Sequence, residues 1–363
     1  MNDLRPIVID GIFLQGEVVT GIGRLWREIL QRWARREIGR RIVLLRRGSL
    51  SPGLEGLRVR DVPPVDRWED EPPVVQGVCD EVNAALFLST YYTHPQTCPS
   101  VLWVHDMIPE RMGFDLSKPI WRQKHAAIDR AVAYATSSAH SLKDLRNIVP
   151  AAATKPAVVA GCGVSETLRP LDDAEVRKFQ ESFVKAKLGG RAYIFMPGHT
   201  HGYKNGQLLV DALSRMDCTH IAVLLTKLSL EAERLRAIPN LIVHCEPLSD
   251  ADMRLAYGCA FAMVYPSYYE GFGLPVAEAM ACGCPVICAG TSSLREVGGD
   301  AALMIDPREP DHLLKALTTL SQPKARQLLV ARGLDQARTF NWYDVAAKLE
   351  AFVLHTIGGA GGP

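Results

Sequence analysis

Residues 261–287 read FAMVYPSYYEGFGLPVAEAMACGCPVI and contain the pattern of a strand, a turn, a helix and a second strand. The apolar run FAMV is followed by a polar turn with Gly271 and Gly273, and then by an apolar helical stretch at residues 276–281. Pro275 suits the first turn of a helix, because its missing N–H has no partner there. The stretch ends in the strand-like run PVI. This order is typical of a βαβ unit in a parallel sheet.

The same alternation extends outward over the whole chain. Short apolar β-branched runs of this kind are typical of buried parallel strands. A polar helical stretch at residues 172–186, ending at Gly189 and Gly190, separates two series of runs. We therefore expect an α/β chain with two doubly wound, Rossmann-like domains that face each other across a cleft. The expected strands are residues 7–9, 42–45, 85–88 and 101–104 in the first half, and 193–196, 221–225, 241–243, 261–264 and 285–287 in the second.

The boundary between the two series divides the chain into domains. We expect an N-terminal domain over residues 1–168 and a C-terminal domain over residues 169–341. Residues 342–363 should form a C-terminal helix and tail, which could return to the N-terminal domain. Ligands of doubly wound sheets bind beyond the carboxyl ends of the strands, so the cleft is the expected site.

Length and charge restrict the class of protein. The 363 residues are enough for two domains that each bury a core. Because 41 Lys and Arg residues balance 40 Asp and Glu residues, the net charge of +1 argues against nucleic acid as a partner. No apolar run approaches the roughly 18–20 residues that cross a bilayer, and residues 1–6 lack an apolar signal core. A cytoplasmic location, including the inner face of the membrane, is the expectation.

The turn in the quoted stretch is suited to a phosphorylated ligand. Gly271 and Gly273 let the backbone approach a ligand closely, and the amides and dipole of the following helix start favour a diphosphate. Glu278, expected in the first helical turn, would repel phosphate unless it accepts hydrogen bonds from ribose hydroxyls. Glu270 could accept hydrogen bonds from a sugar. The alternative is that Glu278 is a favourable helix-start charge and Glu270 a solvated loop residue.

These residues resemble a known family. Glu270 and Glu278, with seven residues between them in the quoted stretch, are similar to the signature of the GT-B retaining glycosyltransferases of family 4, also called group 1. The likeness continues through residues 292–302 to Asp306, and residues 340–342 resemble the closing motif of the family. It covers nearly the whole chain, more strongly in the second half.

The resemblance implies that residues 1–168 form the acceptor-side domain and residues 169–341 the nucleotide-sugar-binding domain. It also implies roles for residues of the second half. Glu278 would hold the ribose of a nucleotide-sugar donor. Lys204, in the segment HGYKNG, matches the diphosphate lysine of the family, although a solvated loop lysine is the alternative. The donor sugar and its diphosphate would be held by Glu270 and by the amides of Gly271, Phe272, Gly273 and Leu274.

One position departs from the family pattern. The family usually has an arginine five residues before the lysine, where this chain has His199. A neutral imidazole carries less charge than a guanidinium and cannot bind phosphate through two parallel hydrogen bonds. His201 could help, or the charge could come from elsewhere.

In the first half, two segments follow strands. Gly21 and Gly23 lie in a short glycine loop that lacks the full dinucleotide fingerprint. The loop resembles the first glycine loop of the family, near the donor phosphates, and the alternative is a turn at a helix start. His105, at the end of a strand, resembles the family histidine that contacts the donor sugar. A buried core histidine is the alternative, and Asp106 should fix the local backbone.

Residues 24–41 form a basic amphipathic stretch with seven arginines against two glutamates. Such a stretch could bind an anionic membrane surface. A helix that packs on a sheet needs the same apolar stripe, which is the alternative that we favour.

Two patterns could suggest a metal. Cys282, Cys284 and Cys288 lie in an apolar run without zinc-site spacing, so buried free thiols are expected. Asp250 and Asp252 have the Asp-x-Asp form of metal-bound diphosphate sites, but a preceding serine makes helix capping the simpler interpretation. We expect no metal and no cofactor.

The resemblance implies transfer of a sugar from a nucleoside diphosphate to an acceptor hydroxyl, with retention of the anomeric configuration. The segment HDMIP resembles members that use GDP-mannose or related donors. The acceptor could be a glycan, including a lipid-linked one in surface polysaccharide assembly. The alternatives are a nucleotide-sugar epimerase and a non-catalytic nucleotide-sugar-binding protein of the same fold. A dehydrogenase is disfavoured, since the first unit has no GxGxxG.

Overall fold

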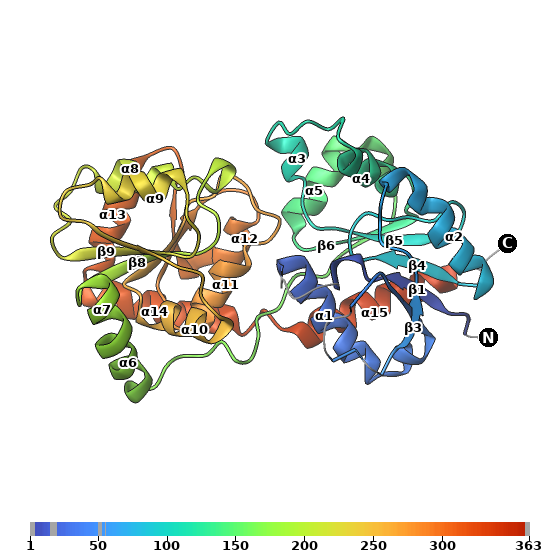
Figure 1. Ribbon diagram of the computed structural model, residues 1–363, viewed down its shortest axis with the longest axis horizontal. Coiled ribbons are helices and arrows are strands. Elements are labelled where there is room, and N and C mark those ends of the chain that lie inside the picture. Colours follow the sequence, from blue (N-terminus) through green and yellow to red (C-terminus); the bar gives the residue numbers. More distant parts are fainter. Residues whose placement is uncertain (1–3, 15–19, 50–52, 55, 360–363) are drawn as a thin grey trace. The chain divides into compact units, whose positions relative to one another are not determined.

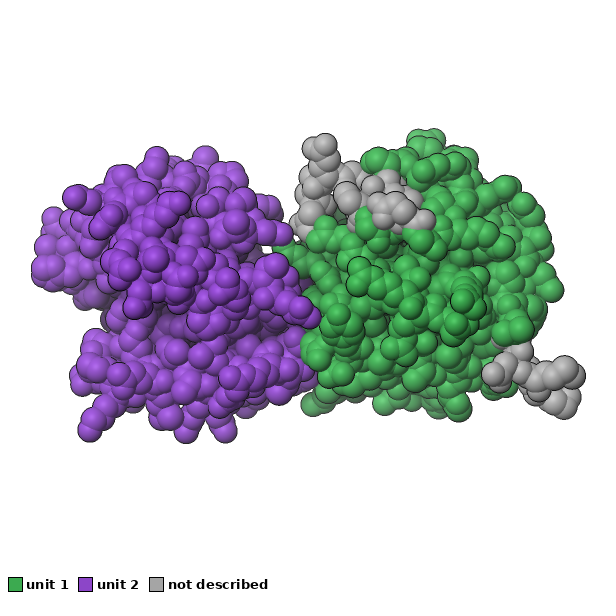
Figure 2. Space-filling model, turned by 90° about the horizontal axis from the view of Figure 1, so that it is seen from below, with its two compact units in different colours: residues 1–163, 341–363 green, residues 164–340 purple. Residues whose placement is uncertain are grey.

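The chain forms two compact units in a computed structural model that describes residues 4–14, 20–49, 53–54 and 56–359. Unit 1 comprises Met1–Gly163 and Asn341–Pro363, and unit 2 comprises Val164–Phe340 (Figures 1 and 2). The first division falls five residues before the boundary expected at 168, and the second falls one residue before that expected at 341. The end of the expected tail, residues 360–363, lies outside the described residues.

Unit 1 is built on a seven-stranded parallel sheet. Its strands are β1 (Ile7–Asp10), β2 (Ile42–Arg46), β3 (Arg58–Asp61), β4 (Leu86–Ser89), β5 (Ser100–Val104), β6 (Ala133–Thr136) and β7 (Ala157–Val159). Across the sheet the order is β3-β2-β1-β4-β5-β6-β7, so it reverses between β1 and β4. The sequence predicted β1, β2, β4 and β5 and missed β3, β6 and β7. The missed strands are an exposed edge strand with two arginines, a strand with two alanines, and a strand of three residues.

Helices connect the strands of unit 1 (Figure 1). They are α1 (Gly21–Ala34), α2 (Glu71–Glu81), α3 (Ile108–Arg111), α4 (Pro119–Arg130), α5 (Ala139–Ile148) and α15 (Trp342–Gly359). The basic stretch expected at residues 24–41 begins within α1, which itself begins at Gly21 because the Thr20 hydroxyl caps it by accepting a hydrogen bond from the Gly23 amide. The basic stretch is not one helix: α1 ends at Ala34, and Glu37–Arg41 form a separate 3-10 helix.

The apolar stripe of α1 is buried inside unit 1. Helix α15 packs on α1, and the Trp33 indole donates a hydrogen bond of 3.0 Å to the Ala346 carbonyl. This confirms the packing interpretation, because the stripe is no longer available to a lipid surface. The buried residues are Leu25, Trp26, Ile29, Leu30 and Trp33.

The chain returns to unit 1 at Asn341, next to the point where it leaves at Gly163. A Cβ on Gly163 would lie 2.5 Å from the Trp342 backbone nitrogen and from its indole ring. The absence of a side chain at Gly163 therefore lets the start of α15 pack against the end of the first segment.

Unit 2 contains a six-stranded parallel sheet. Its strands are β8 (Ala192–Met196), β9 (Ile221–Leu225), β10 (Ile242–Cys245), β11 (Ala262–Tyr265), β12 (Val286–Ala289) and β13 (Ala302–Ile305). The order β10-β9-β8-β11-β12-β13 is that of a dinucleotide-binding Rossmann sheet, with a switch point between β8 and β11. Successive side chains of β8 enter different cores: Tyr193 and Phe195 pack on one face, Ile194 and Met196 on the other.

The helices of unit 2 precede, connect and follow these strands (Figure 1). They are α6 (Asp173–Phe179), α7 (Lys185–Leu188), α8 (Gln207–Leu213), α9 (Leu230–Arg236), α10 (Asp250–Cys259), α11 (Leu274–Ala281), α12 (Leu294–Gly298), α13 (Pro310–Leu320) and α14 (Pro323–Ala337). The polar helix expected at residues 172–186 continues from α6 to α7 through a π-helical segment, Gln180–Val184. It stops where Gly189 adopts a left-handed φ of 61°.

The predicted fold class, two Rossmann-like α/β domains, is confirmed. Both sheets are parallel, and each reverses its strand order once. Among the described residues, no helix is long and apolar enough to cross a membrane.

We expect Gly163→Ala to destabilise unit 1, because the new methyl group would meet backbone atoms that cannot move aside. Overpacking of this kind costs about 1–3 kcal/mol, which should lower the melting temperature by several degrees. Gly77→Ala is the matched control, since Gly77 lies in α2 with nothing within 4 Å of its would-be Cβ. The control should be neutral or slightly stabilising. Equal melting temperatures for both variants would contradict the packing of Gly163 on Trp342.

Candidate active site

The predicted site residues of unit 2 lie at the switch point of its sheet. Lys204 follows β8, and Glu270 follows β11, the neighbouring strand. The connections from these two strands run in opposite directions across the sheet, and ligands of doubly wound sheets bind beyond the carboxyl ends of the strands at such a point. The topology therefore brings together two residues that are 66 positions apart in the chain.

A left-handed turn positions the loop between β11 and α11. Gly273 has a φ of 102°, a conformation that other residues rarely adopt, and directly precedes Leu274, the first residue of α11. A Cβ on Gly273 would also lie 2.5 Å from the Leu294 side chain. Pro275 lies in the first turn of α11, as predicted. The glycine is thus required by backbone conformation and by packing, besides any approach of a ligand.

Two serines hold the backbone of this loop. The Ser293 hydroxyl is hydrogen-bonded to the carbonyl groups of Glu270 and Phe272, at 2.8 and 2.9 Å. The Glu270 amide donates a hydrogen bond of 2.9 Å to the Ser292 hydroxyl. Both serines lie just before α12, in the segment that continues the family signature. Their hydrogen bonds fix the direction in which the Glu270 side chain leaves the backbone.

Lys204 and Glu270 form an ion pair of 2.6 Å, and both side chains are mostly buried. The Lys204 ammonium also donates a hydrogen bond of 3.0 Å to the Tyr265 hydroxyl, at the end of β11. Burial opposes the charge on Lys204, but Tyr265 and Glu270 outweigh it, so the pKa of Lys204 lies above its usual value. Neither residue is the solvated loop residue of the alternative interpretation.

Glu278 lies deeper in α11 than predicted. Because the helix begins at Leu274, Glu278 is in the second turn, and the first turn contains no acidic residue. The expectation of a first-turn position was wrong, and with it the alternative of a helix-start charge. The side chain is 8% exposed, and the Tyr257 hydroxyl donates a hydrogen bond of 3.3 Å to its carboxylate.

His199, at the position where the family has an arginine, lies beside a lysine that the sequence analysis did not consider. The Lys227 ammonium, after β9, is 3.0 Å from the His199 Nε2 atom. Partial burial, and then the positive charges of Lys227, His201 and Lys204, lower the pKa of His199. The imidazole is therefore neutral near pH 7 and can accept a hydrogen bond from Lys227.

His105, after β5 of unit 1, is a buried histidine with one unused ring nitrogen. The ring forms a hydrogen bond with the Thr90 backbone, and burial lowers the pKa of His105 to about 3. Among the described residues, its Nε2 atom is buried and has no hydrogen-bond partner. A core histidine with satisfied hydrogen bonds does not fit this observation. A ligand group is one way to satisfy a buried polar atom of this kind.

The glycines after β1 belong to a helix start and not to a free loop. Gly21 and Gly23 lie in the first turn of α1, and a Cβ on Gly23 would lie 2.8 Å from the Phe13 carbonyl oxygen. The prediction of a glycine loop at these residues was therefore wrong, and the alternative of a helix start is confirmed. Asp106 does fix the local backbone, since its carboxylate accepts a hydrogen bond of 2.9 Å from the Ile108 amide.

The Asp-x-Asp pattern lies at the start of α10, whose first residue is Asp250. Ser249 caps α10 and accepts a hydrogen bond from the Asp252 amide, while its hydroxyl contacts the Asp252 carboxylate at 2.6 Å. This confirms the capping interpretation. The three cysteines at 282, 284 and 288 are buried free thiols, and burial raises the pKa of each to about 12.

Comparison with known proteins agrees with this geometry. Residues 178–333, which lie within unit 2, match the family described as "Glycosyl transferases group 1". The match covers most of unit 2 and less than half of the chain. The resemblance inferred from the sequence is thus confirmed, and the matched residues include both β8 and the β11–α11 loop.

Among curated relatives, an O-antigen chain mannosyltransferase B of Escherichia coli is 48% identical over 94 residues, 26% of this chain and 25% of the relative. A D-inositol 3-phosphate glycosyltransferase of Acidothermus cellulolyticus is 27% identical over 236 residues, 60% of this chain and 51% of the relative. The chain thus spans about half, or less, of the length of these relatives.

Two solved structures share the fold. A sucrose-phosphate synthase of Thermosynechococcus elongatus gives a TM-score of 0.76 at 18% identity, over 98% of this chain and all of that one. WaaG, a glycosyltransferase involved in lipopolysaccharide biosynthesis, gives 0.74 at 15% identity, with the same coverage. The likeness extends over both units, which supports the two-domain GT-B architecture.

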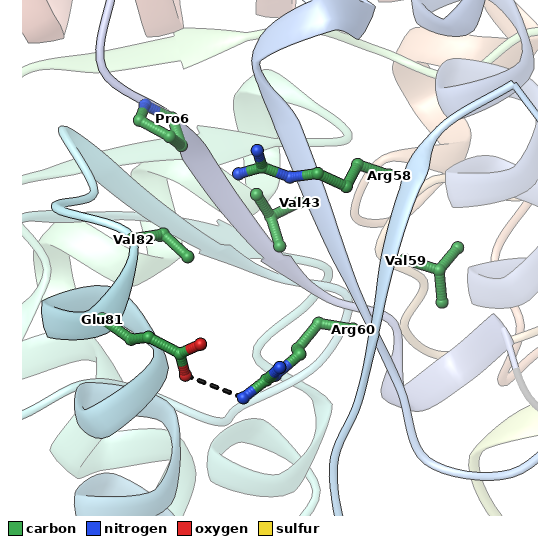
Figure 3. Close-up of a pocket in the computed structure, with 7 residues that line it drawn as sticks. All are labelled: Pro6, Val43, Arg58, Val59, Arg60, Glu81 and Val82. Carbon is green, nitrogen blue, oxygen red and sulfur yellow. Dashed lines mark hydrogen bonds and ion pairs between the residues drawn. The ribbon is translucent and has the colours of Figure 1, made fainter.

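A pocket in unit 1 lies away from these residues. It has a volume of about 450 Å³ and is lined by residues of β2, β3 and the end of α2, with an ion pair of 2.8 Å between Arg60 and Glu81 at its rim (Figure 3). Pro6, before β1, also lines it, so the pocket lies near the amino ends of the strands. Group 1 donors are expected at the opposite, carboxyl ends.

Several residues of the site had no role in the sequence analysis. Tyr265, Tyr257 and Lys227 contact the predicted residues, but only Tyr265 lies within the motif region. Tyr265 could have been found, because it is the last residue of an apolar strand that leads into the signature. Tyr257 and Lys227 lie on other elements and become neighbours only through the sheet order.

We expect His105 to make unit 1 less stable as the pH falls. A folded-state pKa of about 3, below the unfolded value of about 6.5, means that the unfolded chain binds a proton more readily. The stability that the neutral His105 side chain contributes is then present above pH 6.5. The free energy of unfolding falls by about 2 kcal/mol between pH 7 and pH 5. Thermal unfolding at both pH values should show a smaller difference for His105→Gln than for the wild type.

The exposed His220 provides the control for this comparison. His220→Gln should keep the pH dependence of the wild type. If His105→Gln also keeps it, His105 is not held neutral in the folded protein.

Proposed function

We propose that this chain is a retaining, metal-independent glycosyltransferase that transfers a sugar from a nucleoside diphosphate sugar to an acceptor hydroxyl. The observation that carries the proposal is the ion pair between Lys204 and Glu270 at the switch point of unit 2. A cation suits the departing diphosphate, and a carboxylate suits the hydroxyls of the donor sugar. Both residues lie within the region that matches the family.

In the proposed reaction, the bond between the anomeric carbon and the diphosphate oxygen breaks, and a bond from that carbon to the acceptor oxygen forms on the same face. The acceptor proton passes to the departing diphosphate. The transition state has oxocarbenium character, so the main task of the protein is to stabilise the charge that develops on the diphosphate. Lys204 would do this, aided by the backbone amides of Gly271, Phe272, Gly273 and Leu274.

Other residues would orient the donor. Glu278 would accept hydrogen bonds from the ribose, because its buried carboxylate lies one turn beyond the glycine turn. The unused Nε2 atom of His105 would contact the donor sugar. Gly21 and Gly23, at the start of α1, would lie near the donor phosphates.

For the donor we propose GDP-mannose or a related nucleotide sugar. Several relatives are named mannosyltransferases, including one of O-antigen chains. A structural neighbour was solved with UDP and glucose, but at 15% identity it supports the fold and not the base. For the acceptor we propose a glycan, including a lipid-linked one, in surface polysaccharide assembly. A membrane contact through residues 24–41 would use exposed arginines and not the buried apolar stripe.

We expect Lys204→Ala and Glu270→Ala each to lower the rate of transfer by about a hundredfold or more, because each removes a group that acts on developing charge. The assay measures the release of nucleoside diphosphate with and without acceptor. Lys178→Ala and Glu181→Ala, two exposed residues of the helix that begins at α6, are the charge-matched controls and should be unaffected. Near-normal rates for both site variants would refute this assignment.

The same assay distinguishes the proposal from its alternatives. An epimerase would convert the donor sugar without an acceptor, and a binding protein would show no turnover with any acceptor. The product should have the anomeric configuration of the donor by NMR, and the rate should persist in EDTA. Inversion, or a loss of activity that added divalent cation restores, would contradict the corresponding part of the proposal.

We expect a guanine nucleotide to stabilise the protein more than other nucleotides do. A ligand that binds the folded state raises its melting temperature, and at equal concentration the tighter ligand raises it more. Thermal unfolding with GDP, UDP, ADP and dTDP, alone and as their sugars, measures the preference. A larger shift with UDP or ADP would replace the GDP-mannose assignment.

A further inference from the structure

The loops after β8 and β9 bring three basic side chains together at the carboxyl ends of these two strands of unit 2. His199 and Lys204 follow β8, and Lys227 follows its neighbour β9. Two hydrogen bonds join the loops beside the basic residues. The Gly198 amide donates to the Thr226 hydroxyl at 2.7 Å, and the Thr200 hydroxyl donates to that of Ser229 at 2.5 Å. The position of Lys227 next to His199 is therefore set by the backbone of both loops.

The two lysines of this group differ in their partners. Lys204 is paired with Glu270, which balances its charge. In the described part of the chain, Lys227 forms no ion pair, and its hydrogen-bond partner is the His199 imidazole. Glu231, the nearest acid along the chain from Lys227, instead accepts a hydrogen bond from Thr200. The charge of Lys227 is thus the one that no carboxylate of the site balances.

The contact with His199 also limits where Lys227 points. An ammonium has three donors and no acceptor, so a neutral imidazole that accepts one of them leaves two for a ligand. A solvated lysine would have no fixed direction. Here the Lys227 side chain, although exposed, turns toward the loop after β8, which also carries Lys204.

We propose that Lys227, oriented by His199, is the second cation that binds the diphosphate of the donor. This inference rests on the proposed function. Lys204 and Lys227 together would provide the two positive charges that a diphosphate requires, with His199 as a positioning residue where the family has an arginine. The site should accordingly bind a nucleoside diphosphate more tightly than the corresponding monophosphate, and Lys227 should account for part of that preference.

The test is isothermal titration of GDP and GMP into the wild type and into Lys227→Met. Loss of one charge-assisted hydrogen bond to phosphate should weaken GDP binding by about tenfold or more, and GMP binding by less than about threefold. Lys178→Met removes an equal charge from the exposed face of α6, at the opposite side of unit 2 from α9 (Figure 1), and should change neither affinity. If the donor screen selects another base, its diphosphate and monophosphate replace GDP and GMP.

A second variant tests the link to His199. In Lys227→Met, the additional change His199→Arg should restore most of the GDP affinity, because a guanidinium would supply the missing charge from the neighbouring loop. Wild-type GDP binding by Lys227→Met would overturn the inference, and so would an equal loss for GDP and GMP or a failure of rescue. If the wild-type protein binds none of the nucleoside diphosphates, the proposed function falls together with this inference. If the wild type binds them but Lys227→Met or its rescue by His199→Arg does not behave as expected, only this inference falls and the proposed function stands.

Discussion

The ion pair between Lys204 and Glu270 is the interaction on which the candidate site depends. Removing two charges from water is costly, and their attraction offsets that cost only when other polar groups satisfy them. Tyr265 provides such a group for the lysine. The Ser292 and Ser293 hydroxyls fix the backbone that carries the glutamate. The pair therefore holds two loops at the switch point while keeping both charges close to the surface that a ligand would occupy.

This arrangement explains how one pair can serve two groups of a ligand. A diphosphate competes with Glu270 for the Lys204 ammonium, and sugar hydroxyls compete with Lys204 for the Glu270 carboxylate. The exchange replaces one set of charge-assisted hydrogen bonds by another, so neither charge is left unpaired in a buried position. The left-handed turn at Gly273 is the matching backbone constraint, because it fixes where α11 begins.

The two units are related to known proteins in different ways. The family match lies within unit 2, where motif residues, sheet order and side-chain contacts all point to the switch point of the sheet. For unit 1, the relation to known proteins rests on the likeness of the fold, at low sequence identity, and on single residues. Of these, His105 stands out, since burial keeps it neutral and leaves one nitrogen without a partner among the described residues. A buried donor or acceptor in that state is costly unless a ligand satisfies it.

The sequence by itself determined the fold class, most of the strands and the family, because buried parallel strands and a glycine turn before a helix leave strong local patterns. It also identified Lys204, Glu270 and Glu278, since these belong to one motif set. It could not determine where α11 begins, because leucine is common both in helices and just before them, so Leu274 does not mark the boundary. Glu278 was therefore placed one turn too early. Weakly apolar edge strands such as β3 were missed for a related reason: they lack a buried pattern. Only the tertiary structure decided that Glu270 pairs with Lys204, that Tyr257 contacts Glu278 and that Lys227 lies beside His199. These contacts depend on which strands are neighbours in the sheet, and spacing along the chain does not encode that order.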